Sequence, residues 1–511
     1  MPGGMDCIDP CDHHMYSPSC VDGHWVCNAS DQCGECEPVG AMDCVDPCDG
    51  TMYLPSCIDG AWICERGDAC PGQCAAEWSL GWGTDGWDQA DGVALGPNDE
   101  VLVAAYFRDT LTFGTDQLTS AGDADVLLLW LDADGELLQA RSFGGPERDE
   151  YAGLAVDGAG NAVLAIEFDG VADFGFGSVD AANGGTVLLK LSPTGALVWG
   201  KQLAMGVFSD AEGVAVDPQG NVVLAGSVSG PLDFGGAVLS CPDDQRIFVA
   251  KLDPDGDHIW STCFGGPSYE YVYGVSSNAA FGVVVTGTFR ESIDIGGQVL
   301  TSAGGYDAFV AAFDADGVFR YSHRIGGSGD DAGADIVGVG YGGAYVVGAF
   351  SDTVDLGGGP VTAQNELDAF VVRYTPSGEY QWGSALVGAS EETFGSELWS
   401  VATRPNGDVV VGGHFTGVTD ATGELRSSAG SYDLVTTVRD MNGQQIWGCT
   451  DGGYNTDQIR DVAVTFEGEV VIVGTQWSGS QFDLGDGPHD ATAQGDSFVA
   501  KLLPPDAADS R

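Results

Sequence analysis

Basic residues are scarce in this chain of 511 residues: 18 Lys and Arg stand against 76 Asp and Glu, a formal net charge of −58. A surface of that sign repels nucleic-acid phosphates and anionic lipid headgroups, so we expect no nucleic acid as a partner. It attracts divalent cations and basic protein segments. The composition therefore indicates a cation or a basic protein segment as the class of ligand.

Long apolar runs and known catalytic signatures are missing as well. No run of 18 or more apolar residues occurs, so we expect no insertion into a membrane. GxSxG, HExxH and P-loop motifs are absent, and histidines such as His258, His323, His414 and His489 share no repeat position. These absences favour a protein that is not an enzyme.

Cysteine is abundant, and twelve of the 15 cysteines lie before residue 75 in two copies of one pattern. "GMDCIDPCDHHMYSPSCVDGHWVC" is followed by "AMDCVDPCDGTMYLPSCIDGAWIC". So short a copy cannot build an apolar core, and its six cysteines predict three disulfides, with the pairing left open. The cysteines expected to form them are Cys7, Cys11, Cys20, Cys27, Cys33, Cys36, Cys44, Cys48, Cys57, Cys64, Cys70 and Cys74.

Zinc is the alternative for these copies, because Cys33 and Cys36 form a CxxC near His24. The second copy has Ala61 where the first has His24, and a ligand set should survive duplication, so we favour disulfides. We expect two cysteine-rich modules, at 1–38 and 39–75.

Disulfides indicate an extracellular, cell-surface or periplasmic location. The opening residues "MPGGMDCIDP" have neither the basic flank nor the apolar stretch of a secretory leader. We therefore expect that a leader was removed from the sequence shown.

Residues 76–511 repeat one strand-rich unit seven times. The aligned segments "VLVAAYF", "AVLAIEF", "VVLAGSV", "VVVTGTF", "YVVGAF", "VVVGGHF" and "VVIVGTQ" recur about every 61 residues. The units are rich in β-branched residues and glycine, without helical periodicity, and Asp-Gly turns separate their strands. This pattern predicts an all-β, seven-bladed β-propeller with one four-stranded blade per copy.

Closure of the ring is predicted from the tryptophans. Trp199, Trp260 and Trp447 each stand 27 residues before the next copy's anchor glycine, and Trp78 has the same spacing although it belongs to no complete copy. The seventh copy stops at "SFVAKLLPPDAADSR", before its outer strand. We therefore expect "AEWSLGWG" to supply the outer strand of the last blade, which leaves no unpaired sheet edge at the closure.

The repeats resemble the bacterial seven-bladed β-propeller family often called SBBP, on the segments "LDFGG", "IDIGG", "SAGGYDAFVAAFDADG" and "VAVDPQGNVVLAGS". The resemblance covers residues 76–503 and all seven copies. It implies a propeller that is exported or surface-associated, and it implies little about function.

Acidic residues recur at two positions of the unit. Seventeen residues before five of the seven anchors stand Asp88, Asp149, Glu270, Asp331 and Asp457, near the expected mouth of the central channel. A second set, seven residues after the anchor, includes Asp173, Asp233, Asp294, Asp355 and Asp420. Converging carboxylates suit a hard cation such as Ca²⁺, so the first set forms the candidate ligand and metal site. The simpler interpretation is that these side chains cap turns.

The favoured function is therefore an exported or cell-surface binding protein, a monomer whose acidic propeller face takes a divalent cation, a protein or a glycan. The alternative is a hydrolase or lyase that uses carboxylates at the propeller axis.

Three further cysteines, Cys241, Cys263 and Cys449, interrupt the propeller. Cys241 and Cys263 belong to one blade and can pair, although the expected register does not place them opposite each other. Cys449 is left as a buried thiol, an intermolecular bridge or a partner of the front modules.

Overall fold

The computed structural model describes residues 73–504 and short strands within residues 7–64. Positions left undescribed within 73–504 are 114–115, 204–208, 237, 242–245, 279–281, 340–342, 387–394, 420, 422–425, 478–480, 485–487 and 491–494. All regular elements in the described part are strands. That part contains no helix long and apolar enough to cross a membrane.

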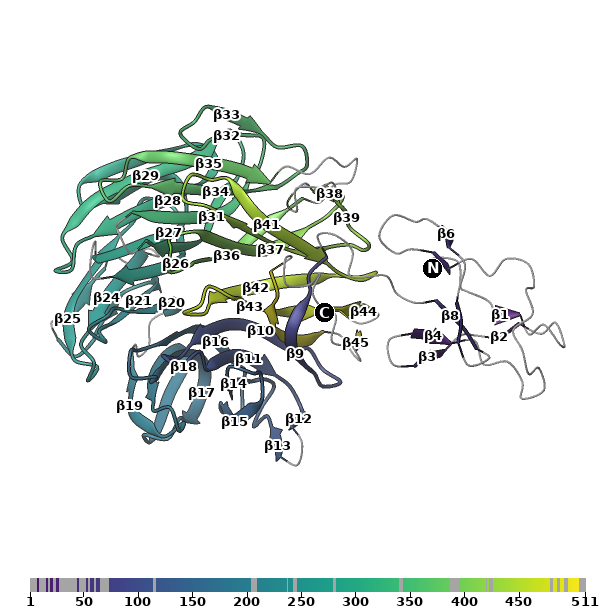
Figure 1. Cartoon of the computed structure of the whole chain (residues 1–511). Coiled ribbons are helices and arrows are strands. Elements are labelled where there is room, and N and C mark those ends of the chain that lie inside the picture. The colour runs from purple at the N-terminus through teal and green to yellow at the C-terminus, as the bar shows by residue number, and fades with distance from the viewer. Residues whose placement is uncertain are drawn as a thin grey trace.

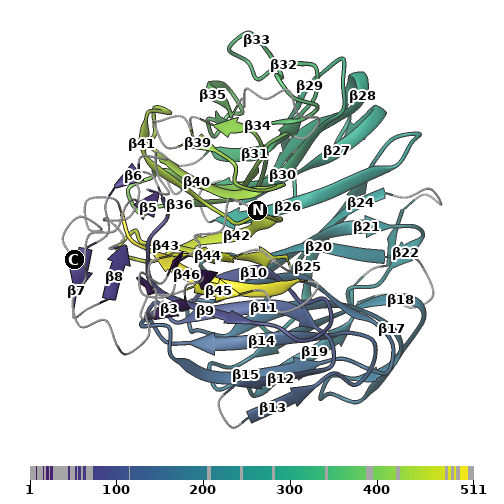
Figure 2. The same cartoon turned by 90° about the vertical axis from the view of Figure 1, so that its right-hand side faces the viewer.

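Seven four-stranded antiparallel units surround a common centre, with the first strand of each near the middle (Figure 2). The first strands are β10 (Gln89–Leu95), β16 (Asp149–Val156), β20 (Ser209–Val216), β26 (Glu270–Asn278), β30 (Asp331–Gly338), β36 (Glu397–Thr403) and β42 (Asp457–Val464). The second strands are β11 (Val101–Phe107), β17 (Ala162–Asp173), β21 (Val222–Val228), β27 (Gly282–Ile295), β31 (Ala344–Phe350), β37 (Val409–Phe415) and β43 (Val470–Gln476).

The outer half of each unit completes the sheet. The third strands are β14 (Asp125–Leu131), β18 (Ser178–Leu191), β24 (Arg246–Leu252), β28 (Gln298–Phe313), β34 (Asp368–Tyr374), β40 (Asp433–Arg439) and β46 (Asp496–Leu502). The outer strands are β15 (Leu137–Phe143), β19 (Leu197–Gln202), β25 (His258–Phe264), β29 (Phe319–Gly327), β35 (Tyr380–Leu386), β41 (Gln445–Asp451) and β9 (Ala76–Trp82). The predicted seven-bladed propeller is confirmed by this strand order.

The apolar core lies between neighbouring blades. Second strands such as β21, with the sequence VVLAGSV, are buried along their whole length because both of their faces are covered. The buried apolar residues in the described part form seven clusters, and each cluster combines residues of two adjacent blades. Each junction between blades is thus a separate small core, which explains why every copy repeats the same apolar pattern.

Short hairpins project between the second and third strands. They are β12–β13 (Thr110–Phe113, Asp116–Thr119), β22–β23 (Pro231–Leu232, Leu239–Ser240), β32–β33 (Thr353–Asp355, Pro360–Thr362), β38–β39 (Val418–Thr419, Arg426–Ser427) and β44–β45 (Gln481–Asp483, Pro488–Asp490). In these hairpins and in the long β17–β18 hairpin, Asp233, Asp355 and Asp173 each accept a hydrogen bond from the backbone N–H two residues later, at 2.7–2.8 Å. Asp294 accepts one from Gly297 N–H at 2.8 Å. Asp420 lies outside the described residues. These aspartates cap turns, as the simpler interpretation expects.

Four of the seven turns between third and outer strands join a blade to the one before it through a tryptophan. In a turn such as Asp314-Ala315-Asp316-Gly317, the Asp314 carboxylate accepts backbone N–H groups and the glycine takes a φ of 80°. The indole of Trp260, from the preceding blade, lies where a Cβ on Gly317 would stand and donates to Ala315 O at 3.0 Å. The same lock joins Trp78 to Ala133, Trp199 to Pro254 and Trp382 to Met441. We call these four turns the turn face.

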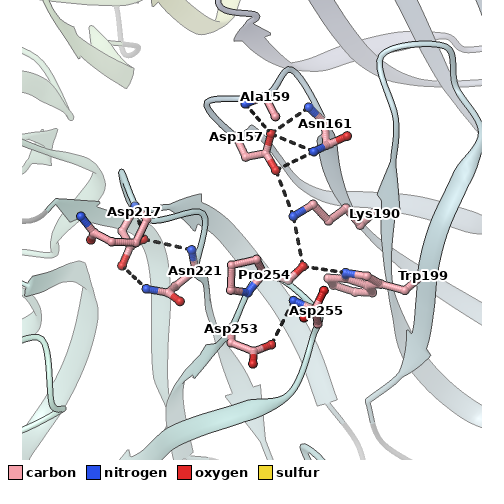
Figure 3. Close-up of polar contacts among 11 residues, drawn as sticks. Asp157, Ala159, Asn161, Lys190, Trp199, Asp217, Asn221, Asp253, Pro254 and Asp255 are labelled. Carbon is pink, nitrogen blue, oxygen red and sulfur yellow. Dashed lines mark hydrogen bonds and ion pairs between the residues drawn. The ribbon is translucent and has the colours of Figure 1, made fainter.

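Figure 3 shows how charge reinforces one of these locks. The Pro254 carbonyl accepts both from the Trp199 indole at 3.0 Å and from the Lys190 ammonium at 3.1 Å. Lys190 also forms a buried ion pair with Asp157 at 2.9 Å. One lysine therefore ties two blades together, and its charge is balanced by a carboxylate that is itself fixed by Asn161.

The ring is closed by its most N-terminal strand. β9 pairs antiparallel with β46, and Trp78 lies opposite Lys501. This is the pairing that the tryptophan spacing predicts. A disulfide between Cys74 and Cys449 further ties the start of β9 to the outer strand of the sixth blade.

Two expectations about cysteines are thereby resolved. Cys74 does form a disulfide, but the prediction that it pairs within its own module is wrong, because the closing strand starts next to β41 and brings Cys74 within 4.8 Å, Cα to Cα, of Cys449. Cys241 and Cys263 are also bonded, with their Cα atoms 6.0 Å apart. The disulfides expected among the other front cysteines involve side chains outside the described residues.

The front of the chain forms short strands beside the ring (Figure 1). They are β1 (Cys7–Ile8), β2 (Met15–Tyr16), β3 (Ser19–Val21), β4 (His24–Val26), β5 (Cys44–Val45), β6 (Met52–Tyr53), β7 (Ser56–Ile58) and β8 (Ala61–Cys64). β4 from the first copy pairs with β8 from the second, so the two copies share one sheet. The boundary predicted between them at 38/39 stays a prediction.

Candidate functional site at the ring axis

Each first strand contains a β-bulge at the same place. The pairing with the second strand skips one residue in every blade, and the skipped residues are Asp91, Ala152, Glu212, Tyr273, Ala334, Trp399 and Arg460. A bulge redirects the side chain of the extra residue away from the regular pleat. We call these seven residues the bulge ring.

Six of the seven bulge residues line one cavity of about 790 Å³ near the ring axis, and Ala152 is the exception. The wall also contains residues from the loops that lead into the first strands, among them Asp330 and Asp331. The cavity is therefore built where the first strands begin, at the end of the blades opposite the turn face. We call it the axial cavity.

The lining of the axial cavity combines carboxylates with aromatic rings. Tyr271, Tyr273, Tyr306 and Trp399 provide the rings, and Asp91, Glu212, Asp330 and Glu397 provide carboxylates beside the more deeply placed Asp331. Arg460 is the single basic residue among the lining residues. Its guanidinium lies 4.2 Å from the centre of the Trp399 ring and its Nε is 3.3 Å from Asp91 Oδ1, so its charge is already engaged.

Hydrogen bonds fix several of these side chains. Trp399 Nε1 donates to Glu397 Oε2 at 2.7 Å, and Gln89 Nε2 donates to Asp91 Oδ1 at 2.5 Å. Burial raises the pKa of Asp91, and Arg460 opposes that rise. Burial, together with Glu212, raises the pKa of Tyr273 to about 12, so this phenol remains neutral at physiological pH.

Below the bulge ring, polar side chains connect neighbouring first strands. Asp461 Oδ2 accepts from Val93 N–H at 2.8 Å, and its Oδ1 accepts from the Ser400 hydroxyl at 2.6 Å. Asp335 Oδ2 accepts from Val401 N–H at 2.9 Å. Burial raises the pKa of Asp335 to about 6 and that of Asp461 to about 7. These groups hold the fifth, sixth, seventh and first blades in register around the cavity.

The five acids predicted as the ligand and metal site are all buried, at 0–1% exposure. They are Asp88, Asp149, Glu270, Asp331 and Asp457. In each case the carboxylate accepts from the backbone N–H four residues earlier, at 2.5–2.8 Å, and so closes the loop that enters the first strand.

Of these five acids, Asp331 alone lines the axial cavity. Among the described residues, no group of three or more His, Cys, Asp or Glu side chains is arranged to hold a metal ion. The ligand and Ca²⁺ role of the five stays a prediction, and the structure adds a role in holding loops.

The sequence interpretation missed a second buried acid at most junctions. Asp125, Asp307, Asp368 and Asp433 stand 20 residues after the anchors of their copies, and Asp496 stands 22 residues after its anchor. All five lie on third strands. A Cβ on Gly144 would touch both Asp125 and Asp149, so these two carboxyl groups face each other. Burial is the main cause that raises the pKa of Asp149, Asp331 and Asp433 to about 7, and the partner acid adds to it. In the junction between the third and fourth blades an ion pair, Arg246–Glu270 at 3.7 Å, takes this place.

The bulge ring was also missed, although a signal exists. Its members stand fourteen residues before the anchors and differ in nearly every copy, whereas the position two residues later is Val, Leu or Ile in all seven copies. Such variation within an otherwise regular repeat marks a side chain that packing does not constrain.

Comparison with known proteins finds weak similarities. No protein-family model matches the chain. The regulatory protein FlaEY of Caulobacter vibrioides is 29% identical over 161 residues, which cover 29% of this chain and only 16% of that protein's length. Among solved structures, the WD40 domain of Neurospora crassa Pan2 has a TM-score of 0.40 and 10% identity, over 81% of this chain and 89% of that one. Sqt1 of Chaetomium thermophilum has a TM-score of 0.40 and 12% identity, over 79% and 97%. The propeller assignment rests on the strand order of this chain.

Proposed function

We propose that this protein is a non-catalytic binding protein, that its axial cavity holds the ligand, and that the ligand is a protein segment with basic side chains. The lining of the cavity carries this proposal: carboxylates and aromatic rings converge there, and the one arginine among them is engaged by Asp91 and Trp399. Ammonium and guanidinium groups bind to such walls through ion pairs and through the faces of the rings.

The net charge of −58 supports the same ligand class, because a negative field draws basic segments toward the molecule before they dock. A glycan could also stack on the tyrosines, but neutral sugars gain nothing from the carboxylate excess. We therefore place the basic protein segment first.

Calorimetric titration of the full chain with oligolysine and oligoarginine peptides tests the proposal. We expect binding that weakens with salt, and a loss of about tenfold in affinity in Glu397→Gln, since a charge-assisted hydrogen bond contributes about 1.5–3 kcal/mol. Asp134→Asn is the matched control, because Asp134 is an exposed acid on the turn face and the change in net charge is the same. Equal weakening in both variants, or no binding at millimolar peptide, contradicts a defined site. Binding of a neutral oligosaccharide in place of the peptides would identify the glycan as ligand.

Ca²⁺ binding by Asp88, Asp149, Glu270, Asp331 and Asp457 is a separate proposal, supported by their recurrence in five of the seven copies. Titration with Ca²⁺ tests it. No heat at millimolar Ca²⁺ rejects this proposal and leaves the peptide site untouched.

A carboxylate-based hydrolase or lyase is the second candidate, favoured by one observation: Asp91, Glu212 and Glu397 line the same cavity as the basic Arg460. Mass spectrometry of polysaccharide and peptide mixtures incubated with the protein would reveal cleavage. An activity that Asp91→Asn and Glu397→Gln both abolish would make this candidate the better one.

We further propose an extracellular, cell-surface or periplasmic location and membership of the SBBP repeat family. Two disulfides, Cys74–Cys449 and Cys241–Cys263, support the location because such bonds persist in oxidising compartments. The related segments "LDFGG", "IDIGG" and "VDLGG", together with "DAFVA", "DAFVV" and "DSFVA", support the family. We expect a monomer, which sedimentation analysis would check.

A further inference from the structure

The fourth blade contributes an aromatic wall to the axial cavity. Tyr271 and Tyr273 on β26 have parallel rings, with centroids 6.3 Å apart and an interplanar angle of 6°. Tyr306 on β28 lines the same cavity, and its phenol helps to raise the pKa of Tyr273. Three phenol rings from one blade thus meet at one side of the cavity.

The backbone and a neighbouring arginine position Tyr306. Its N–H donates to Asp330 Oδ1 at 2.8 Å, which ties the end of the β27–β28 hairpin to the loop that enters β30. Arg290 lies opposite Tyr306 in the strand pairing, with its guanidinium carbon 5.8 Å from the ring centre. The Arg290 guanidinium therefore lies within the range of a cation–π contact with this ring.

A carboxylate lies next to the wall. Glu212 is the bulge residue of the third blade. Among the neighbouring ionisable groups, it contributes most to the raised pKa of Tyr273. Tyr273, the bulge residue of the fourth blade, is 41% exposed, so its ring is available to a ligand. The bulges of two adjacent blades thus bring one acid and one exposed ring together.

We propose that Tyr271, Tyr273, Tyr306 and Glu212 form a subsite for an alkylated ammonium group, of the kind carried by methylated lysine or by choline. This inference rests on the proposed function and narrows its ligand. A methylated ammonium spreads its charge over methyl groups, is weakly hydrated and needs few hydrogen bonds. It therefore gains more from ring faces than an unmodified lysine does. The single carboxylate balances its charge.

The test compares four ligands on the full chain by calorimetry: choline, ethanolamine, and one lysine peptide with and without trimethylation of the lysine. We expect choline to bind at least tenfold more tightly than ethanolamine, and the trimethylated peptide at least tenfold more tightly than the unmodified one. A tighter trimethylated peptide than choline identifies a protein source, and the reverse identifies a small molecule. Both orders uphold the subsite.

Substitutions test which residues bind choline. Tyr273→Ala should weaken choline about tenfold, whereas Tyr273→Phe, which keeps the ring face, should weaken it less than threefold. Glu212→Gln should also weaken it. Tyr454→Ala is the control, because Tyr454 is 55% exposed and lies outside the cavity lining.

The outcomes separate this inference from the proposed function. If unmodified basic peptides bind and depend on Glu397 but methylation adds nothing, the subsite is wrong and the proposed function stands. If choline binding is unchanged in Tyr273→Ala, the subsite is wrong. If no peptide and no ammonium compound binds, both proposals fall.

Discussion

The turn face and the bulge ring lie at opposite ends of the same blades. They differ in how far their residues agree between copies of the repeat. On the turn face, Trp78, Trp199, Trp260 and Trp382 make one contact four times over, an indole laid on a glycine. In the bulge ring, corresponding positions hold acids, tyrosine, tryptophan, arginine and alanine. Four of the seven junctions between blades use this one contact, so the residues that make it stay alike. A side chain that points into an open cavity has no such constraint, and its variety indicates a role toward a ligand.

The largest effect we expect comes from opening the ring at its closure. Replacing both Cys74 and Cys449 by serine should cost about 5 kcal/mol in the free energy of unfolding, because the bond spans 375 residues. Replacing Cys241 and Cys263 should cost about 3 kcal/mol, since that bond spans 22 residues. Urea unfolding measures both. A smaller loss from the first pair would show that β-strand pairing alone closes the ring.

The buried acid pairs should make stability depend on pH. Because burial raises the pKa of Asp149 to about 7 in the folded state, above the unfolded value of 3.8, the folded chain keeps a proton that the unfolded chain releases. This contribution is fully present below pH 4 and is lost as pH rises toward 7, by at most about 1.4 kcal/mol per pH unit for one proton.

Asp149→Asn cannot ionise, so its free energy of unfolding should fall less than that of the wild type between pH 4.5 and 7.5, measured by urea unfolding. Glu270→Gln provides the contrast. It breaks the ion pair with Arg246 and should destabilise the protein at pH 7.5, where Asp149→Asn should not. Parallel pH profiles for the wild type and Asp149→Asn would refute a proton retained on Asp149 in the folded state.

A glycine of the turn face should be costly to replace. Gly317→Ala forces a side chain into a φ of 80° and into the indole of Trp260, so we expect a loss of about 3 kcal/mol. Gly297→Ala is the matched control: φ is 91° there, but open space surrounds the site, and about 1 kcal/mol should be lost. Thermal and urea unfolding give the difference. Equal losses would mean that the indole contact adds nothing.

The bulge ring should show the smallest effect on stability. Tyr273→Ala and Glu212→Gln should each change the free energy of unfolding by less than about 1 kcal/mol, since neither side chain belongs to an apolar cluster. A loss of unfolding free energy as large as that of Gly317→Ala would show that the bulge ring stabilises the fold. The turn face and the bulge ring would then not differ in role.

Much of the architecture could be predicted from the repeat. The period placed the second strand of every blade correctly, and the spacing of Trp78 identified the closing strand, which pairs opposite Lys501 as expected. Local patterns sufficed here, because alternation and turn residues determine strands, and a fixed period determines how many blades form.

The candidate site was less predictable. Spacing identified Asp149 and its equivalents but could not show that their carboxylates turn into their own loops, toward N–H groups four residues back. The bulge that exposes Tyr273 shows in the sequence only as a position that varies between copies, and the strand pairing that skips this residue is what identifies it. Cys74 was assigned to its module because the spacing matched the first copy, although its partner lies 375 residues away.

The sequence by itself determined the number of blades, their strands and the strand that closes the ring, since each of these follows from short-range pattern and repetition. Only the tertiary structure decided which acids face each other, which cysteine meets Cys74 and which six bulge residues line the axial cavity. These features depend on how distant strands approach across junctions, and closing a ring sets that geometry for all blades at once.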